Sequence, residues 1–115
     1  SSAASDVYKR QSDNRASLTK ISIEKDKAGF DKASANKELA QVDANLKVMN
    51  DKIKVMKEKS AGYKTALQGQ TTTSTAEKDK LKALTTENKQ LNDQISVLES
   101  ETNGLYNQRK AISLG

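Results

Sequence analysis

A single seven-residue frame of apolar side chains runs through most of this 115-residue chain. Apolar residues recur at alternating steps of three and four, which places them on one side of an α-helix. A stripe of this width is buried only when a second helix packs against it. The frame therefore predicts an all-α fold of the coiled-coil class, in which long helices pair along a continuous seam.

We expect this helix-pairing seam to combine aliphatic residues with one tyrosine and one asparagine. Its predicted members are Leu39, Val42, Leu46, Met49, Ile53, Met56, Tyr63, Leu67, Leu81, Leu84, Asn88, Leu91, Ile95, Leu98, Leu105 and Ile112. Burial of these side chains against one another is the expected source of stability.

The first eleven residues, SSAASDVYKRQ, resemble the translation of an adaptor used in transposase-based sequencing libraries. The resemblance covers all eleven codons and implies a non-native tail, which is set aside when the fold is considered. We expect residues 1–11 to be disordered and the remainder to be a metagenomic fragment of a larger protein. Under this interpretation the native N-terminus is missing, so the sequence does not indicate a compartment.

The composition is typical of long exposed helices rather than of a globular domain. Histidine, cysteine, proline and tryptophan are absent, and hydrophobic residues make up only 34% of the chain. Without histidine or cysteine the usual nucleophiles, bases and soft metal ligands are lacking. We therefore expect no enzyme activity, no catalytic residues, no cofactor and no metal. No apolar run approaches the roughly 20 residues that span a bilayer, so no membrane span is expected.

Two helix signals divide the chain. A glycine followed by a threonine run at 69–73 predicts a helix end, and Ser74 with Glu77 has the spacing of a capping box at a helix start. We expect a long helix over 12–68, a turn over 69–75 and a second helix over 76–113. The first helix is weakly patterned before residue 39, where Gly29 lowers its stability by about 1 kcal/mol relative to alanine.

The second helix resembles a leucine zipper over residues 76–112. Leucine recurs every seventh residue from Leu84 to Leu105, and Asn88 occupies the position where a single asparagine fixes register. Basic-region zippers carry an arginine-rich DNA-reading helix directly upstream. The glycine and threonine run stands there instead, so no DNA-binding residues are carried over from the resemblance.

Two arrangements of the helices fit the frame. A continuous parallel rod explains why the frame stays in phase across the threonine run, but it brings Lys52 against Lys57 and Lys59 against Lys64 in a paired copy. An antiparallel hairpin removes these repulsions and pairs Lys52 with Glu101. Exposed ion pairs contribute only about 0–1 kcal/mol each. We favour the antiparallel hairpin, with the parallel rod as the alternative.

The expected partner is another helix of the same chain or of a homo-oligomer. A row of uncharged residues that includes Val48, Val55 and Val97 runs beside the seam and is a candidate face for a protein partner. Six lysines form a candidate anion-contact face, namely Lys47, Lys52, Lys54, Lys57, Lys59 and Lys64. Acidic residues are interspersed among these lysines and the run from Lys47 to Lys64 contains no arginine, which disfavours nucleic acid as a partner. The sequence thus predicts a structural or interaction segment, a spacer or assembly element, with an anionic-polymer-binding coiled coil as the alternative.

Overall fold

The computed structural model describes residues 2–68 and 74–114, and these ranges contain three α-helices and no strand. Helix α1 spans Ser2–Glu24, helix α2 spans Lys32–Leu67 and helix α3 spans Thr75–Ala111. The predicted all-α class is therefore confirmed, but the described chain forms three helices instead of two.

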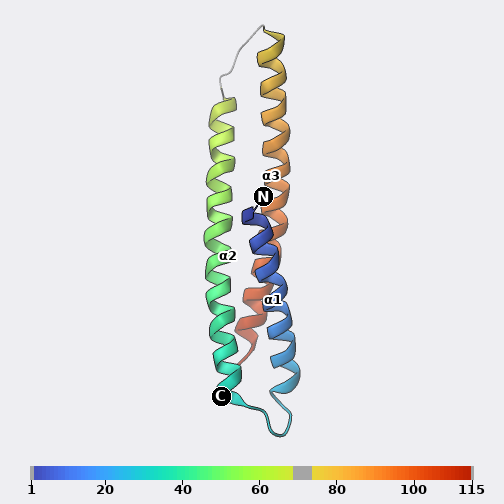
Figure 1. The fold of residues 1–115 in the computed structure, drawn as a ribbon, viewed down its shortest axis with the longest axis vertical. Helices are drawn as coiled ribbons and strands as arrows, with labels where there is room; N and C mark the ends of the chain where they lie inside the picture. Colours follow the sequence, from blue (N-terminus) through green and yellow to red (C-terminus); the bar gives the residue numbers. More distant parts are fainter. Residues whose placement is uncertain (1, 69–73, 115) are drawn as a thin grey trace.

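The three helices lie side by side along one long axis, and the molecule measures 72 × 18 × 16 Å (Figure 1). Helices α2 and α3 run antiparallel, and α1 contacts both of them. Helix α1 covers only the half of the pair nearest the α1–α2 loop, so the other half of α2 and α3 extends beyond the N-terminal end of α1 (Figure 1). The parallel-rod alternative is wrong for this structure, because α3 folds back along α2.

The prediction of one helix over 12–68 is wrong, because the chain turns between Glu24 and Lys32. Gly29 adopts φ +77°, a left-handed conformation that other residues rarely take. Asp31 then caps the new helix, and its carboxylate accepts a hydrogen bond from the backbone N–H of Ser34 at 3.1 Å. The glycine that we interpreted as a weak point inside a helix is a turn residue, and the segment before it packs back onto α2.

The expected disorder of residues 1–11 also differs from the structure, in which residues 2–11 continue α1; residue 1 lies outside the described range. Extending an existing helix avoids the cost of nucleation. In addition, Ala4, Val7 and Gln11 fall in phase with Leu18 on the seven-residue frame, and all four are buried. The adaptor interpretation concerned the origin of these residues and stays a prediction. Their conformation follows from the helix that they join.

Helix α3 begins where the capping signal predicts. The Ser74 hydroxyl oxygen accepts a hydrogen bond from the backbone N–H of Glu77 at 3.5 Å. The helix ends at Ala111, two residues before the predicted end at 113, and the backbone N–H of Ile112 closes the last turn onto Arg109. Of the predicted turn at 69–75, residues 69–73 lie outside the described residues.

Burial divides the molecule into two regions. The three-helix region comprises α1 with residues 32–56 of α2 and 95–111 of α3, and the buried residues of the three helices all lie in it. The distal arm comprises residues 57–67 of α2 and 75–94 of α3, and no described residue of this arm is fully buried. The third helix is therefore what closes the core, since a two-helix seam leaves one side of each side chain open to water.

Candidate helix-docking site

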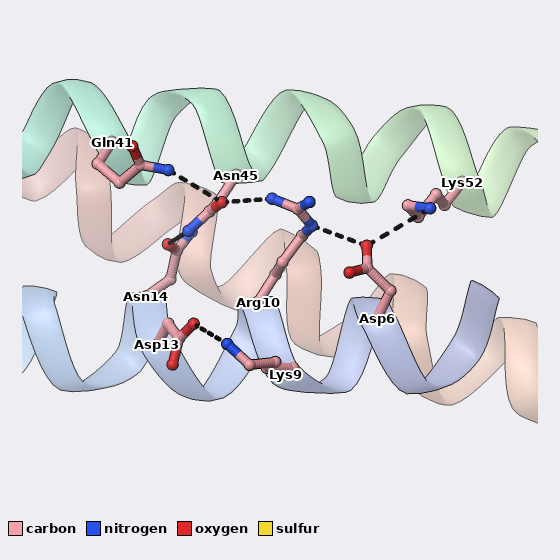
Figure 2. Close-up of polar contacts among 8 residues, drawn as sticks. All are labelled: Asp6, Lys9, Arg10, Asp13, Asn14, Gln41, Asn45 and Lys52. Carbon is pink, nitrogen blue, oxygen red and sulfur yellow. Dashed lines mark hydrogen bonds and ion pairs between the residues drawn. The ribbon is translucent and has the colours of Figure 1, made fainter. Parts of the chain in front are cut away.

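A pair of asparagines joins α1 to α2 inside the three-helix region. The side-chain amide of Asn45 donates to Asn14 Oδ1 at 3.0 Å (Figure 2). The amide of Asn14 in turn donates to the backbone carbonyl of Val42 at 3.2 Å. Asn14 is 1% exposed and Asn45 is 7% exposed. Buried amides without partners cost about 1–3 kcal/mol, so this pair favours the one register in which the two residues meet.

An ion-pair chain extends the asparagine pair toward the N-terminal end of α1. Arg10 donates to Asn45 Oδ1 at 2.7 Å and to Asp6 Oδ2 at 2.7 Å, and Lys52 Nζ lies 3.5 Å from the same carboxylate oxygen (Figure 2). The hydrogen bond from Arg10 holds the pKa of Asp6 below its ordinary value, and the charge of Lys52 adds to this effect. One turn of α1 thus presents an acidic side chain, Asp6, and a basic side chain, Arg10, to α2.

A buried glutamine makes the corresponding contact with α3. The amide nitrogen of Gln11 donates to the backbone carbonyl of Leu98 and to Thr102 Oγ1, each at 3.1 Å. Gln11 and Thr102 are both 1% exposed. Within the described part of the chain, Gln11 Oε1 has no hydrogen-bond partner. This interface therefore contains one buried polar atom whose desolvation is not compensated.

Two more ion pairs tie α1 to the hairpin on either side. Lys20 Nζ lies 2.9 Å from Glu38 Oε2, and hydrogen bonding to this carboxylate raises the pKa of Lys20. Arg15 pairs with Glu101 of α3. The predicted pair between Lys52 and Glu101 is wrong, because α1 lies between these residues and each pairs with an α1 side chain instead.

The predicted seam residues differ in burial according to region. Those of the three-helix region, together with Ile112 directly after α3, are all buried: Leu39, Val42, Leu46, Met49, Ile53, Met56, Ile95, Leu98, Leu105 and Ile112. Those nearer the α2–α3 connection are only partly buried: Tyr63, Leu67, Leu81, Leu84, Asn88 and Leu91. In the distal arm Ser60 Oγ lies 2.9 Å from Asn88 Oδ1 and 2.5 Å from Asn92 Oδ1, so its single O–H donates to either of these two amide oxygens. The seam therefore continues into the arm, but one side of it is open.

The six candidate anion-contact lysines do not form one free basic surface. Lys52 pairs with Asp6, and Lys57 pairs with Glu99 of α3. Lys59 lies 5.8 Å above the ring of Tyr63. Lys47, Lys54 and Lys64 are exposed and make no ion pair within 2–68 and 74–114. Half of the predicted face is thus already in contact with neighbouring side chains.

The uncharged row beside the seam stays at the surface, with Val55 60% and Val97 54% exposed. Gly69, which belongs to this row, lies outside the described residues. Beyond the N-terminal end of α1 a groove opens between α2 and α3, which we call the distal groove. Its lining includes Ala3 at the end of α1, Met56 and Tyr63 from α2, and Leu91 from α3.

Sequence reasoning missed the residues through which α1 docks. Gln11 and Asn14 lie on the same frame as Leu18 and Ile21, so continuing the frame toward the N-terminus finds them. Setting aside residues 1–11 concealed the signal at Gln11. Asn45 lies beside the seam, and it is distinguished from the other polar residues of α2 by its burial and by its contacts with Asn14 and Arg10 of α1.

Comparison with known proteins gives no relative: no family model, curated protein or solved structure matches this chain. No described helix is long and apolar enough to cross a membrane. Among residues 2–68 and 74–114, no three carboxylate, histidine or cysteine side chains come together as metal ligands would.

Proposed function

We propose that this chain is a structural and interaction module of the coiled-coil class, which acts as a spacer or assembly element within a larger protein. The observation that carries the proposal is the α1 interface, where a buried apolar stripe is combined with polar pairs that meet in one register: Asn14 with Asn45, Lys20 with Glu38 and Arg15 with Glu101. These three pairs lie outside residues 1–11, so they do not depend on the origin of that segment. Apolar burial supplies the affinity between helices, and the polar pairs specify which helices align and where.

The elongated shape supports the same proposal. The molecule is 72 Å long but only 18 Å and 16 Å across. A bundle of this shape holds two points at a fixed separation, which is the property that a spacer needs. Its stability depends on the seam, so disrupting the seam should abolish the fixed separation.

Ile53→Asp tests the proposal because Ile53 is 3% exposed and faces the other helices. An unpaired charge buried at this position should unfold the three-helix region cooperatively. Circular dichroism against temperature measures this effect. Val55→Asp is the matched control, since Val55 lies on the same helix and is 60% exposed. Similar melting curves for the two variants would contradict the seam as the basis of the module.

The anion-binding alternative has less support, because Lys52 and Lys57 are already in ion pairs. It makes a separate prediction: binding to DNA that weakens steeply with salt and is lost when Lys47, Lys54 and Lys64 are changed to glutamate. Absence of binding at low salt would exclude it.

A further inference from the structure

The connection between α1 and α2 consists of residues 25–31, and one glycine sets its direction. Isolated turn hydrogen bonds hold it, such as the one from the Phe30 N–H to the Lys27 carbonyl at 3.3 Å. The reversal of the chain depends on Gly29, which adopts φ +77°. An alanine avoids this conformation and favours a helix. The connection contains no proline, so no residue in it prevents a helix from continuing.

The seven-residue frame keeps its phase through this connection. Leu18 of α1 and Leu39 of α2 are separated by three whole repeats of seven residues, and so are Ile21 and Val42. All four side chains are buried. If residues 25–31 became helical, α1 and α2 would join in one helix with both apolar stripes on the same side. A turn by itself requires no particular phase, so the frame suits a helical connection as well as it suits the turn.

The contacts of α1 with α2 are arranged evenly about the connection. Lys20 and Glu38 lie nine residues before and nine residues after Gly29. Asn14 lies 15 residues before it and Asn45 lies 16 residues after it. Two copies with straightened connections would therefore cross antiparallel beside Gly29. In that arrangement α1 of each copy lies on α2 of the other copy in the register that the single chain shows.

We propose that the connection is a hinge through which two copies of this chain exchange α1, which is a domain swap. In the exchanged dimer each α1 packs on the α2–α3 hairpin of the other copy, and residues 25–31 are helical. Exchange replaces each α1 contact by the same contact between copies, so only the connection changes. The inference rests on the proposed function, because it states how an assembly element joins two copies. The contacts that carry it lie outside residues 1–11.

The turn is stabilised by contacts that the exchanged dimer lacks. Asp31 caps α2, and Phe30 packs against the core. Both contacts are lost when the connection straightens, which favours the monomer at low protein concentration. Mass action favours the dimer as the concentration rises. The parent chain should therefore be mainly monomeric at micromolar concentration, and weakening the turn should convert it to the dimer.

The experiment compares the dissociation constant of the dimer for the full chain and for Gly29→Ala, measured by sedimentation equilibrium. Apart from its two chain neighbours, no described atom lies within 4 Å of the place that a Cβ would take at Gly29, so alanine opposes the turn through the backbone alone. It disfavours the turn of the monomer and favours the helix of the dimer. Because both copies carry the change, the dissociation constant should fall by about a hundredfold or more.

Two further variants separate the turn from general helix stability. Gly62→Ala is the matched control, because Gly62 lies inside α2 in both forms. It should stabilise the monomer and the dimer equally and leave the dissociation constant as in the parent. Asp31→Ala removes the helix cap without changing Gly29, and should lower the dissociation constant by about tenfold or more. Equal dissociation constants for Gly62→Ala and Gly29→Ala would overturn the inference.

Insertions into the Gly29→Ala variant test the phase of the frame. Two alanines inserted after Ala28 rotate α1 by about 200° relative to α2 in a continuous helix, so the stripes no longer share one side. Seven inserted alanines lengthen the connection further but keep the phase. We expect the first insertion to restore the monomer and the second to leave the dimer. The same assembly state for both insertions would contradict the exchange of α1.

Spin labels distinguish an exchanged dimer from a dimer formed through any other surface. In a mixed dimer of the Gly29→Ala variant, one copy carries its label at Asp13→Cys and the other at Ala44→Cys, next to the contact between Asn14 and Asn45. Exchange predicts a short distance between the two copies, set by helix axes about 8–10 Å apart and by the reach of the labels. A dimer without this short distance would overturn the inference.

A Gly29→Ala chain that stays monomeric at every concentration, whether folded or unfolded, would also overturn it. The proposed function is decided separately, because Ile53→Asp and Val55→Asp test the seam in the parent monomer. A cooperative loss of structure in Ile53→Asp alone would support the module even if no exchange occurred.

Discussion

Leu98 is fully buried, whereas Leu84, fourteen residues earlier in the same helix and on the same frame position, is only partly buried. Both leucines face α2, and both belong to the same predicted seam. The difference is α1, whose Gln11 donates a hydrogen bond to the backbone carbonyl of Leu98. Helix α1 covers only the half of the helix pair nearest the α1–α2 loop (Figure 1). In this molecule a periodic apolar stripe is sufficient for two helices to pair, but a third helix is needed to remove the stripe from water.

The polar contacts show the same contrast. In the three-helix region Asn14, Asn45 and Gln11 are buried and hydrogen-bonded across helices. In the distal arm the contacts of Ser60 and Tyr63 lie nearer the surface, where water competes for the same groups. Buried polar pairs contribute to the choice of register far more than exposed ones, because only a buried group loses its hydration when the register is wrong.

The largest expected difference between the two regions comes from truncating the two leucines. Leu98→Ala removes a fully buried side chain and should lower the free energy of unfolding by about 2–5 kcal/mol. Leu84→Ala removes a side chain that is already partly hydrated and should cost about 1 kcal/mol. Urea denaturation followed by circular dichroism measures both values. Equal costs would mean that α1 does not shield the seam.

A smaller difference is expected from the polar pairs. Asn45→Ala leaves Asn14 Oδ1 without its donor and also removes the contact of Arg10, so it should cost about 1–3 kcal/mol. Ser60→Ala in the distal arm should change stability by about 0.5 kcal/mol or less. The double variant Asn14→Leu with Asn45→Leu should recover part of the stability lost in the single variant, since both members of the asparagine pair are removed together while Arg10 still loses its acceptor. If the double variant did not regain stability, the two asparagines would contribute more than the hydrogen bond that they make with each other.

The smallest expected effect is the change of stability at acidic pH. The hydrogen bond from Arg10 lowers the pKa of Asp6, and the backbone hydrogen bond from Ser34 lowers the pKa of Asp31. A carboxyl whose pKa is lower in the folded state stabilises the fold above its unfolded pKa of about 3.9 and loses this contribution as the pH falls through the lower folded value. Asp6 joins α1 to α2, and Asp31 caps the start of α2, so both carboxylates stabilise the three-helix region. Acid should therefore reduce the amount by which this region is more stable than the distal arm.

Melting temperatures between pH 6 and pH 2 measure this effect. Asp31→Asn is the matched control, because asparagine also caps a helix but does not titrate. The control should retain more of its stability below pH 4 than the parent does. An identical pH profile would show that the Asp31 carboxylate contributes nothing through its charge.

The helical class, the seam positions and the capped start of α3 could be predicted because they depend on local periodicity and on the Ser74 side chain. The fold-back of α1 could not be predicted in the same way. Gly29 permits either a weak helix or a turn, and the choice depends on whether Leu18 and Ile21 find a surface to pack against. That surface exists only once α2 and α3 have paired, so it is a property of the tertiary structure.

The docking residues illustrate the same limit. Asn14 lies on the frame and could be recognised as facing another helix, but its partner Asn45 lies off the frame. Likewise, Lys52 and Glu101 are correctly placed on facing sides of the hairpin for a pair, yet α1 separates them. Ion pairs that are predicted from the sequences of two helices are unreliable when a third helix packs between the charged residues.

The most direct test of the account is the distance between α1 and α2 in solution. Spin labels attached through Asp13→Cys and Ala44→Cys lie next to the Asn14–Asn45 hydrogen bond, and the chain has no native cysteine to interfere. The fold-back predicts one short distance, set by helix axes about 8–10 Å apart and by the reach of the labels. A distance near 47 Å, which 31 residues of one unbroken helix would give at 1.5 Å per residue, would contradict it.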